Sequence, residues 1–317
     1  MVSIKNIITE PIEKKIILVT GQVTSGKSNI ARISASLGEK NLIIMDFFLE
    51  NLWRMYTIGA LSSNTFKILL DDYLNKQIVN RLIGRGLNLK INEESSIYRS
   101  GFMKSFSYLK KIFTTIDKKK LMNEVKKKNE IILTLHDGLP NIDIFFNTYK
   151  NLKVINVNSD PVHHIYGAVH KYNKSQKKVF SNFDKSNLDQ GIRYKKNNKI
   201  YHPNFYKLNI KLQNKNFIEK LLYLKKSNDF LEKIKVKKYK KNKNFLNINL
   251  NEFILNKKDT INKISNFLNK KINISTLKLV NNFVASKKET NEAKKKFILS
   301  KLKTREKKIF SKMIKTI

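Results

Sequence analysis

The sequence contains no cysteine, which excludes disulfide bonds, thiolate catalysis and cysteine-ligated metal. It also has no run of about 18 to 20 consecutive apolar residues, the length that a membrane-spanning helix needs. The N-terminal segment, MVSIKNIITEPIEKK, carries acidic residues and lacks the apolar stretch of a secretion signal. We therefore expect a soluble cytoplasmic protein without a membrane span. Its 317 residues suffice for one large core or two modest ones.

Arginine is scarce although the protein is strongly basic. Only seven of its 64 basic residues are arginine, and the formal net charge is +39. Residues 1–150 contribute +9 of this charge and the remaining residues +30. Sites that recognise phosphates and bases favour the planar guanidinium group of arginine. We therefore favour compositional drift toward lysine over selected polyanion binding, and expect nucleic acid to bind only nonspecifically.

Four short apolar runs rich in β-branched residues are typical of buried parallel strands. They lie at residues 15–20, 41–46, 130–136 and 152–157. Helical spacing of apolar residues follows at residues 29–37, 64–83 and 162–172. Gly38 is expected to end the first of these helices, and Ser63 to cap the second. The alternation predicts an α/β protein of three layers, in which helices flank a central parallel β-sheet.

The alternation is interrupted at residues 173–244, which are rich in lysine, asparagine and aromatic residues. Inside this segment we expect a hairpin over 193–202, around Asn197-Asn198, and a helix over 217–236. Because a strand-and-helix pattern resumes afterwards, we interpret the segment as a basic elaboration of a single domain that spans 1–317.

The chain after residue 244 is predicted to return to the main fold. A strand is expected at 245–250, followed by a helix to about residue 269 that Asp259 or Thr260 caps. A basic C-terminal helix is expected over 287–317.

The segment GQVTSGKS at residues 21–28 satisfies the phosphate-loop (Walker A) pattern G-x-x-x-x-G-K-[ST]. It lies between a predicted strand and a predicted helix, so that backbone amides and the positive end of the helix would meet a phosphate. Lys27 would place its charge on a terminal phosphate, and the Ser28 hydroxyl would reach a phosphate oxygen or magnesium. The candidate nucleotide-binding residues of this phosphate loop are Gly21, Thr24, Ser25, Gly26, Lys27, Ser28 and Asn29.

Three stretches together resemble the P-loop sulfotransferases and cover most of the chain. TSGKS at 24–28 resembles that family's phosphosulfate loop, [KR]-S-G-T-T. TLHDGLP at 134–140 with LKVINVNSDPVHHIYGAV at 152–169 looks like its K-T-H-L-P and K-V-I-Y-V-x-R-N-P-x-D block. NFLNINLNEFILNKKDTINKISNFLNKKI at 244–272 resembles its late R-F-L-x-I-x-Y-E-D-L segment. The resemblance implies a sulfuryl donor, 3′-phosphoadenylyl sulfate.

The resemblance places His136 on the family's catalytic histidine. A histidine that leaves the carboxyl end of a parallel strand also lies where such sheets bind ligands. Its ordinary pKa of about 6.5 suits it to accept a proton from a hydroxyl or amine. A purely structural histidine in a turn is the alternative. His163, His164 and His170 share one later helix, and we expect surface or packing roles for them.

Two positions depart from the family. Ser159 and Gly167 stand where the resemblance implies an arginine and a serine that hold the donor's 3′-phosphate. Ser159 is kept as a candidate cofactor-binding residue, but a small hydroxyl cannot replace a guanidinium group. Either nearby lysines such as Lys171 take over, or the donor is a different nucleotide. The family's loop lysine is also missing from its usual place, and so is its C-terminal R-K-G segment.

Three functions stay open. The first is sulfuryl transfer to a hydroxyl or amine of a carbohydrate or small molecule, with His136 and Lys27 as catalytic residues and no metal. The second is phosphoryl transfer from ATP, with magnesium on Ser28 and on Asp46 or Asp137. The third is binding of a nucleotide or polyanion without chemistry. Segments 86–113 and 173–244 are expected to shape the acceptor pocket.

Overall fold

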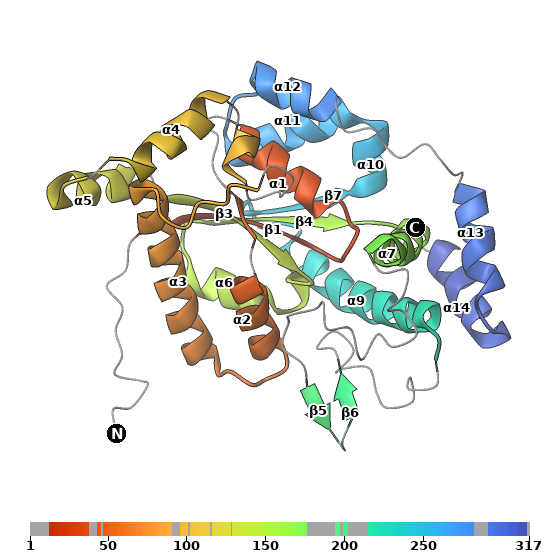
Figure 1. Ribbon diagram of the computed structural model, residues 1–317. Coiled ribbons are helices and arrows are strands. Elements are labelled where there is room, and N and C mark those ends of the chain that lie inside the picture. Colours follow the sequence, from red (N-terminus) through yellow and green to blue (C-terminus); the bar gives the residue numbers. More distant parts are fainter. Residues whose placement is uncertain are drawn as a thin grey trace.

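The computed structural model describes residues 13–37, 43–45, 47–90, 96–100, 102–114, 116–127, 129–175, 194–196, 199–201, 215–281 and 291–315. Five strands form one sheet, in the order β2-β3-β1-β4-β7, and all of its pairs are parallel (Figure 1). They are β1 (Lys15–Gly21), β2 (Ile43–Ile44), β3 (Glu130–His136), β4 (Leu152–Asn158) and β7 (Phe245–Asn249). This confirms the predicted α/β fold with a central parallel sheet.

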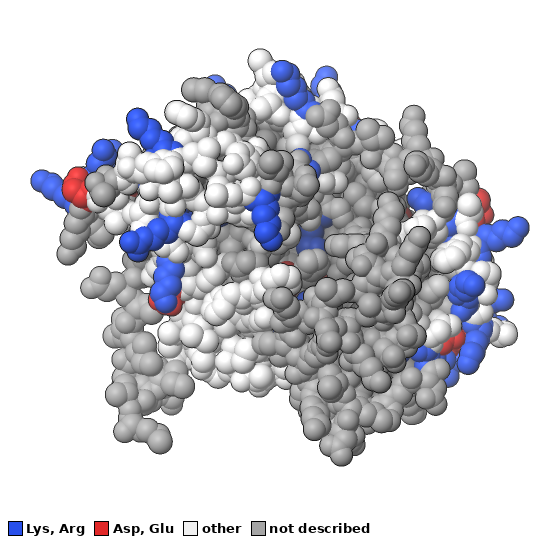
Figure 2. Space-filling model, in the orientation of Figure 1, with Lys and Arg blue, Asp and Glu red and all other residues white. Residues whose placement is uncertain are grey.

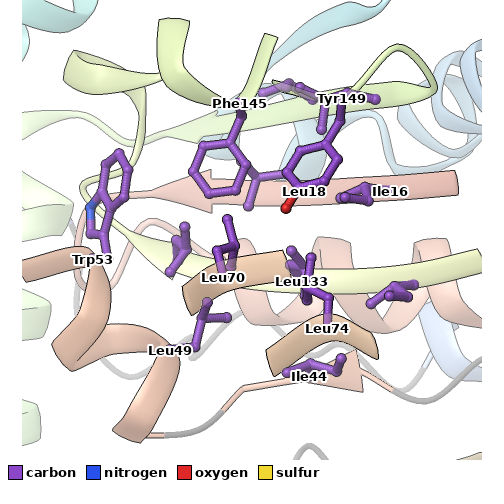
Figure 3. Packing of buried hydrophobic residues seen from close by; sticks show 14 of the residues in the cluster. Ile16, Leu18, Ile44, Leu49, Trp53, Leu70, Leu74, Leu133, Phe145 and Tyr149 are labelled. Carbon is purple, nitrogen blue, oxygen red and sulfur yellow. The ribbon is translucent and has the colours of Figure 1, made fainter. Parts of the chain in front are cut away.

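Apolar helices cover both faces of this sheet, which is why its central strands are apolar on both faces. One face packs against α1 (Lys27–Ser36), α10 (Leu250–Leu255), α11 (Lys257–Leu268) and α12 (Ile274–Asn281). The other packs against α2 (Phe47–Thr57), α3 (Ser63–Ile83) and α6 (Asp143–Thr148). Figure 3 shows Trp53, Phe145, Leu18 of β1 and Leu133 of β3 within the apolar cluster of this second face.

A third apolar cluster joins α7 (Pro161–Ser175) and α9 (Phe217–Tyr239) to α13 (Asn291–Ser300) and α14 (Thr304–Lys315). Ile165, Leu222, Ile298 and Phe310 are fully or nearly fully buried there. The C-terminal helices therefore pack against the domain through apolar side chains, while Lys and Arg gather on their outer surface (Figure 2).

The remaining elements lie at the periphery in Figure 1 or are single turns. They are η2 (Ile97–Ser100), α4 (Phe102–Ile112), α5 (Lys118–Lys127), η3 (Leu139–Asn141), and the antiparallel pair β5 (Tyr194–Lys196) and β6 (Lys199–Tyr201). Of the predicted hairpin, these two strands are present, and Asn197-Asn198 lie outside the described residues. Across the described ranges, no helix has both the length and the apolar character that a membrane crossing requires.

Several predicted boundaries need correction. Ser62, rather than Ser63, caps α3, and its Oγ accepts the Thr65 amide at 3.1 Å. Asn256 precedes α11, which places Asp259 and Thr260 inside its first turn. The single C-terminal helix expected from residue 287 is two helices, α13 and α14. Gly38 lies outside the described residues, as do residues 41, 42 and 46 of the predicted second strand.

Candidate functional site

The phosphate loop leaves β1 at its carboxyl end and enters α1. A Cβ atom at Gly21 would lie 2.2 Å from the Val157 carbonyl oxygen of β4, so only glycine fits against that strand. Gly26, the residue before α1, has a φ of 83°, and Thr24 has a φ of 62°; both values are left-handed. The predicted glycines are thus required by one close approach and one backbone conformation.

The backbone amides of the loop are used in two ways. Ser25 donates its amide to the Gln22 carbonyl at 3.1 Å, and Asn29 donates to the Gly26 carbonyl at 3.0 Å. These two amides are therefore bonded within the loop, so not every backbone amide of the loop is available to meet a phosphate. The first amides of α1 lie at the positive end of that helix, which is the end that faces the loop. The Ser25 Oγ is buried and has no partner among the described residues.

Lys27 is only 4% exposed, yet its charge acts on the polar residues around the loop. It lowers the pKa of His136, which ends β3, and that of His164 in α7. Burial raises the pKa of both Glu50 and Asp137, and Lys27 opposes this effect at each: the pKa of Glu50 ends below its usual value and that of Asp137 above it. The side chain thus lies among the ionisable groups at the sheet edge rather than in the apolar core.

His136 is paired with a carboxylate that the sequence analysis did not identify. His136 lies opposite Gly21 in the strand register. Its backbone amide donates to Glu50 Oε1 at 3.0 Å, and its Nδ1 lies 2.8 Å from the same oxygen. Glu50 is in α2, is 7% exposed, and its Oε2 has no partner in the described part of the chain. The pair therefore fixes the orientation of the imidazole.

The charges of this pair follow from its surroundings. Burial alone would raise the pKa of Glu50, but His136, Lys27 and Arg54 outweigh burial and hold that pKa below its usual value. Burial and then Lys27 lower the pKa of His136, in spite of the opposite effect of Glu50. At neutral pH we infer an ionised Glu50 that accepts Nδ1–H, and a neutral His136 whose Nε2 has a free lone pair.

Asp137 follows His136 with a left-handed φ of 53° and donates its amide to the Gly21 carbonyl at 3.2 Å. Its carboxylate accepts the Asn228 side-chain amide of α9 at 3.2 Å, and burial raises its pKa. The next residue, Gly138, donates its amide to Thr20 Oγ1 at 2.8 Å. These bonds tie the turn after β3 to the end of β1. Asp46 lies outside the described residues, and within the described ranges no three His, Asp or Glu side chains group as a metal site would require.

A pocket of about 90 Å³ opens beside His136 and Glu50. Its apolar lining comes from α2, the turn after β3 and α9, and its members are Trp53, Ile58, Pro140, Leu224 and Leu231. Its polar lining beyond His136, Glu50 and Asp137 consists of Arg54, Thr57, Asn141, Ser227 and Asn228. Of the two segments expected to shape the acceptor pocket, 173–244 contributes through α9. None of the described residues of segment 86–113 lines it, and α2 takes the place expected for that segment.

On the other side of β1, α7 packs directly against the loop. Thr24 Oγ1 donates to the His164 carbonyl at 3.0 Å, and a Cβ at Gly167 would lie 3.2 Å from the Thr24 Cβ. Gly167 therefore lets the helix approach the loop. Ser159 is 7% exposed, and its Oγ has no partner among the residues that the structure describes. Nothing is described of the Lys171 side chain.

His164 differs from His136 in its surroundings. It is 3% exposed and its Nδ1 has no partner within the described ranges. Burial, then Lys225 and Lys27, lower its pKa to about 3, so it stays neutral. This agrees with the packing role expected for it.

No family model matches the chain, and no curated protein matches its sequence. Among solved structures, it is similar to a sulfotransferase from Mycobacterium tuberculosis H37Rv at 11% identity and a TM-score of 0.42, covering 91% of this chain and 77% of the other. It is also similar to a sulfotransferase from Alicyclobacillus acidocaldarius, at 10% identity and a TM-score of 0.41, covering 97% of both chains. A third similar structure is retinol dehydratase in complex with androsterone and the inactive cofactor PAP. Its identity is 11% and its TM-score 0.41, and the match covers 96% of this chain and 81% of the other. At identities and TM-scores this low, the similarity does not indicate which reaction the site carries out.

Proposed function

We propose that the protein transfers a sulfuryl group from 3′-phosphoadenylyl sulfate to a hydroxyl or amine of a small-molecule acceptor. The observation that carries the proposal is the His136–Glu50 pair, which lies between the lysine of a phosphate loop and a partly apolar pocket. Such an arrangement brings an anion site, an oriented base and an acceptor site together at one edge of the sheet.

The residues of the loop fit the phosphosulfate end of this donor. The first amides of α1, the Ser28 hydroxyl and Lys27 offer donors and positive charge to its oxygens, and the buried Ser25 Oγ has an unused hydrogen-bonding capacity. Ser159 remains our candidate for the 3′-phosphate side, because its unpartnered Oγ follows β4 directly. Gly21, Thr24, Gly26 and Asn29 would contribute through backbone shape.

The proposed proton transfer uses His136 Nε2. As the acceptor oxygen forms its bond to sulfur, the bond between sulfur and the phosphate oxygen breaks, and the acceptor proton passes to Nε2. Glu50 stabilises the imidazolium that results and keeps Nδ1 as the protonated nitrogen beforehand. Lys27 would neutralise the charge that develops on the leaving phosphate.

The pocket supports a small acceptor with an apolar part. Trp53, Leu224 and Leu231 would cover such a part, while Asn141 and Ser227 would bond a polar substituent. Of the two acceptor classes predicted from the sequence, this lining favours the small molecule over the carbohydrate.

Phosphoryl transfer is the second candidate, because Lys27 and Ser28 complete a triphosphate-type loop. It would need Asp46 or Asp137 to reach magnesium. Asp137 already accepts the Asn228 amide, so a magnesium ion would have to compete with that hydrogen bond. A nucleotide-binding protein without chemistry is the third possibility, which the same experiment addresses.

The test is a binding titration followed by a turnover assay. Calorimetry with 3′-phosphoadenosine 5′-phosphate and with ATP, each with and without magnesium, is expected to show magnesium-independent binding of the first ligand. With 3′-phosphoadenylyl sulfate and a panel of small aromatic and aliphatic alcohols, we expect acceptor-dependent release of 3′-phosphoadenosine 5′-phosphate that survives a chelator. Binding of ATP alone, dependent on magnesium, would favour the kinase. Tight binding without turnover of any acceptor would favour the third possibility.

A further inference from the structure

The second residue of the phosphate loop is held by α9. Gln22 is 2% exposed, and its Nε2 donates to Asp229 Oδ1 at 3.0 Å and to Glu232 Oε1 at 3.1 Å. An amide nitrogen has two N–H bonds, so both donors are used. These contacts join parts of the chain more than 200 residues apart, with separations of 207 and 210.

Two acidic side chains so close together need compensation. Lys225, which is 2% exposed, donates to Asp229 Oδ1 at 2.6 Å, so Asp229 has a cationic partner. Glu232 is 5% exposed, and burial raises its pKa to about 8, although Lys225 and the Gln22 amide oppose the shift. At neutral pH, Glu232 is therefore protonated and the cluster carries one carboxylate against one ammonium.

The same helix also borders the pocket. Leu224, Ser227 and Leu231 line it, and Asn228 lines it while donating to Asp137. α9 thus contacts the loop through one set of side chains and the pocket beside His136 through another.

We propose that Glu232 and Asp229 are positioning residues, which hold Gln22 and thereby keep the loop between Gly21 and Gly26 in its anion-binding shape. This inference rests on the proposed function only in taking that loop as the donor site. It extends the donor site to a helix that contributes no residue to the phosphate-loop motif.

A consequence is that donor affinity depends on the proton of Glu232. The charged groups that face Glu232 are Lys225 and Asp229 on α9 and Asp137 after β3. Loss of the proton adds an uncompensated negative charge beside the loop, since Lys225 already pairs with Asp229. An anionic ligand should therefore bind more weakly as pH rises through about 8. A negative charge on Glu232, about 10 Å from an anionic ligand in surroundings with an effective dielectric constant of about 20, would change the affinity about tenfold.

The experiment is calorimetric titration of the full chain with 3′-phosphoadenosine 5′-phosphate between pH 7 and 9. The ligand's phosphates are ionised throughout, because their second pKa is about 6. Wild type is expected to lose about tenfold in affinity over this range. Glu232→Gln, which keeps a neutral side chain of the same shape, is expected to bind with an affinity that does not change with pH. Glu292→Gln on the exposed start of α13 is the matched control and should follow wild type.

A second variant tests the contact itself. Gln22→Met keeps the length of the side chain and removes its donors, so we expect weaker binding at pH 7. Because Glu232 is still present, the further loss of affinity between pH 7 and pH 9 should persist in this variant. Wild-type pH dependence in Glu232→Gln, or wild-type affinity in Gln22→Met, would overturn the inference while leaving the proposed function intact. If Glu232 had only a structural role, Glu232→Gln would alter the unfolding temperature and leave the pH profile of binding as it is in wild type.

Discussion

His136 and His164 both lie within the electrostatic reach of Lys27. His136 is the last residue of β3 and His164 is in the helix after β4, so they border the phosphate loop from two sides. Burial lowers the pKa of each. The His136 side chain is 26% exposed and contacts Glu50, whereas His164 is 3% exposed and its Nδ1 has no partner among the described residues. Neutrality is thus common to both, and of the two only His136 combines it, within the described ranges, with a carboxylate partner and an adjoining pocket.

The largest expected difference between the two histidines is in turnover. His136→Ala should lower kcat by about 10²–10⁴, because general-base assistance is typically worth that much. His164→Gln should leave kcat within about threefold and act mainly on stability, since buried side chains that lose their packing usually cost about 1–3 kcal/mol. Steady-state kinetics and thermal unfolding of both variants measure this. Equal loss of kcat in the two variants would remove the distinction.

Lys27 acts on the pKa of both histidines, and its removal should weaken the binding of the donor nucleotide. Lys27→Met is expected to weaken binding of 3′-phosphoadenosine 5′-phosphate by about a hundredfold, as the loss of a charge-assisted contact of about 3 kcal/mol would. Because Lys27 is buried beside Glu50 and Asp137, some loss of stability is also expected, which an exposed loop lysine would not cause. Calorimetry on folded protein separates the two effects. Unchanged affinity would mean that the ligand binds elsewhere.

Glu50→Gln removes the carboxylate partner of His136, a kind of partner that His164 lacks among the described residues, and so tests what the carboxylate contributes. The amide cannot hold Nδ1–H as the carboxylate does, so we expect kcat to fall about ten- to hundredfold while the affinity for 3′-phosphoadenosine 5′-phosphate changes little. Glu50→Asp, which keeps the charge, should recover part of the loss. Full activity of Glu50→Gln would show that the carboxylate does not position the base.

The smallest expected effect is a shift in the pH profile. The base must be unprotonated, and the pKa of His136 is below its usual value, so kcat/KM should be constant near neutral pH and fall on the acid side with a midpoint below about 6.5. Glu50 raises the pKa of His136, so Glu50→Gln should move the midpoint to lower pH. Profiles from pH 5 to 8 are the measurement. A midpoint well above 7 would assign the proton transfer to another group.

The elements that the sequence predicted correctly are those with a strong local pattern. The apolar runs of β1, β3 and β4, the loop with its glycines, and His136 at the end of β3 are all visible within a few consecutive residues. The cap of α3 was misplaced by one position, because Ser62 and Ser63 are chemically identical neighbours. The C-terminal segment is divided into α13 and α14, which both pack in the cluster with α7, and its run of lysines does not mark the break.

Glu50 was missed for a different reason. It lies 86 residues from His136 in the chain, in a helix whose other residues are mostly aromatic and aliphatic. No local motif marks it, and only the return of α2 across the end of β3 brings the two together. The contacts of Gln22 with α9 have the same origin, since long-range contacts carry no local signal.

Gly26 has a consequence for how the protein is made. A Cβ at this position would lie 2.5 Å from Leu250 Cδ1, so the start of α1 rests on the first residue of α10. Gly26 of the phosphate loop is thus in contact with a side chain that the ribosome adds 224 residues later. Contacts this distant in sequence form slowly and late. During synthesis, the phosphate loop therefore reaches its native packing only after β7 and α10 have been made.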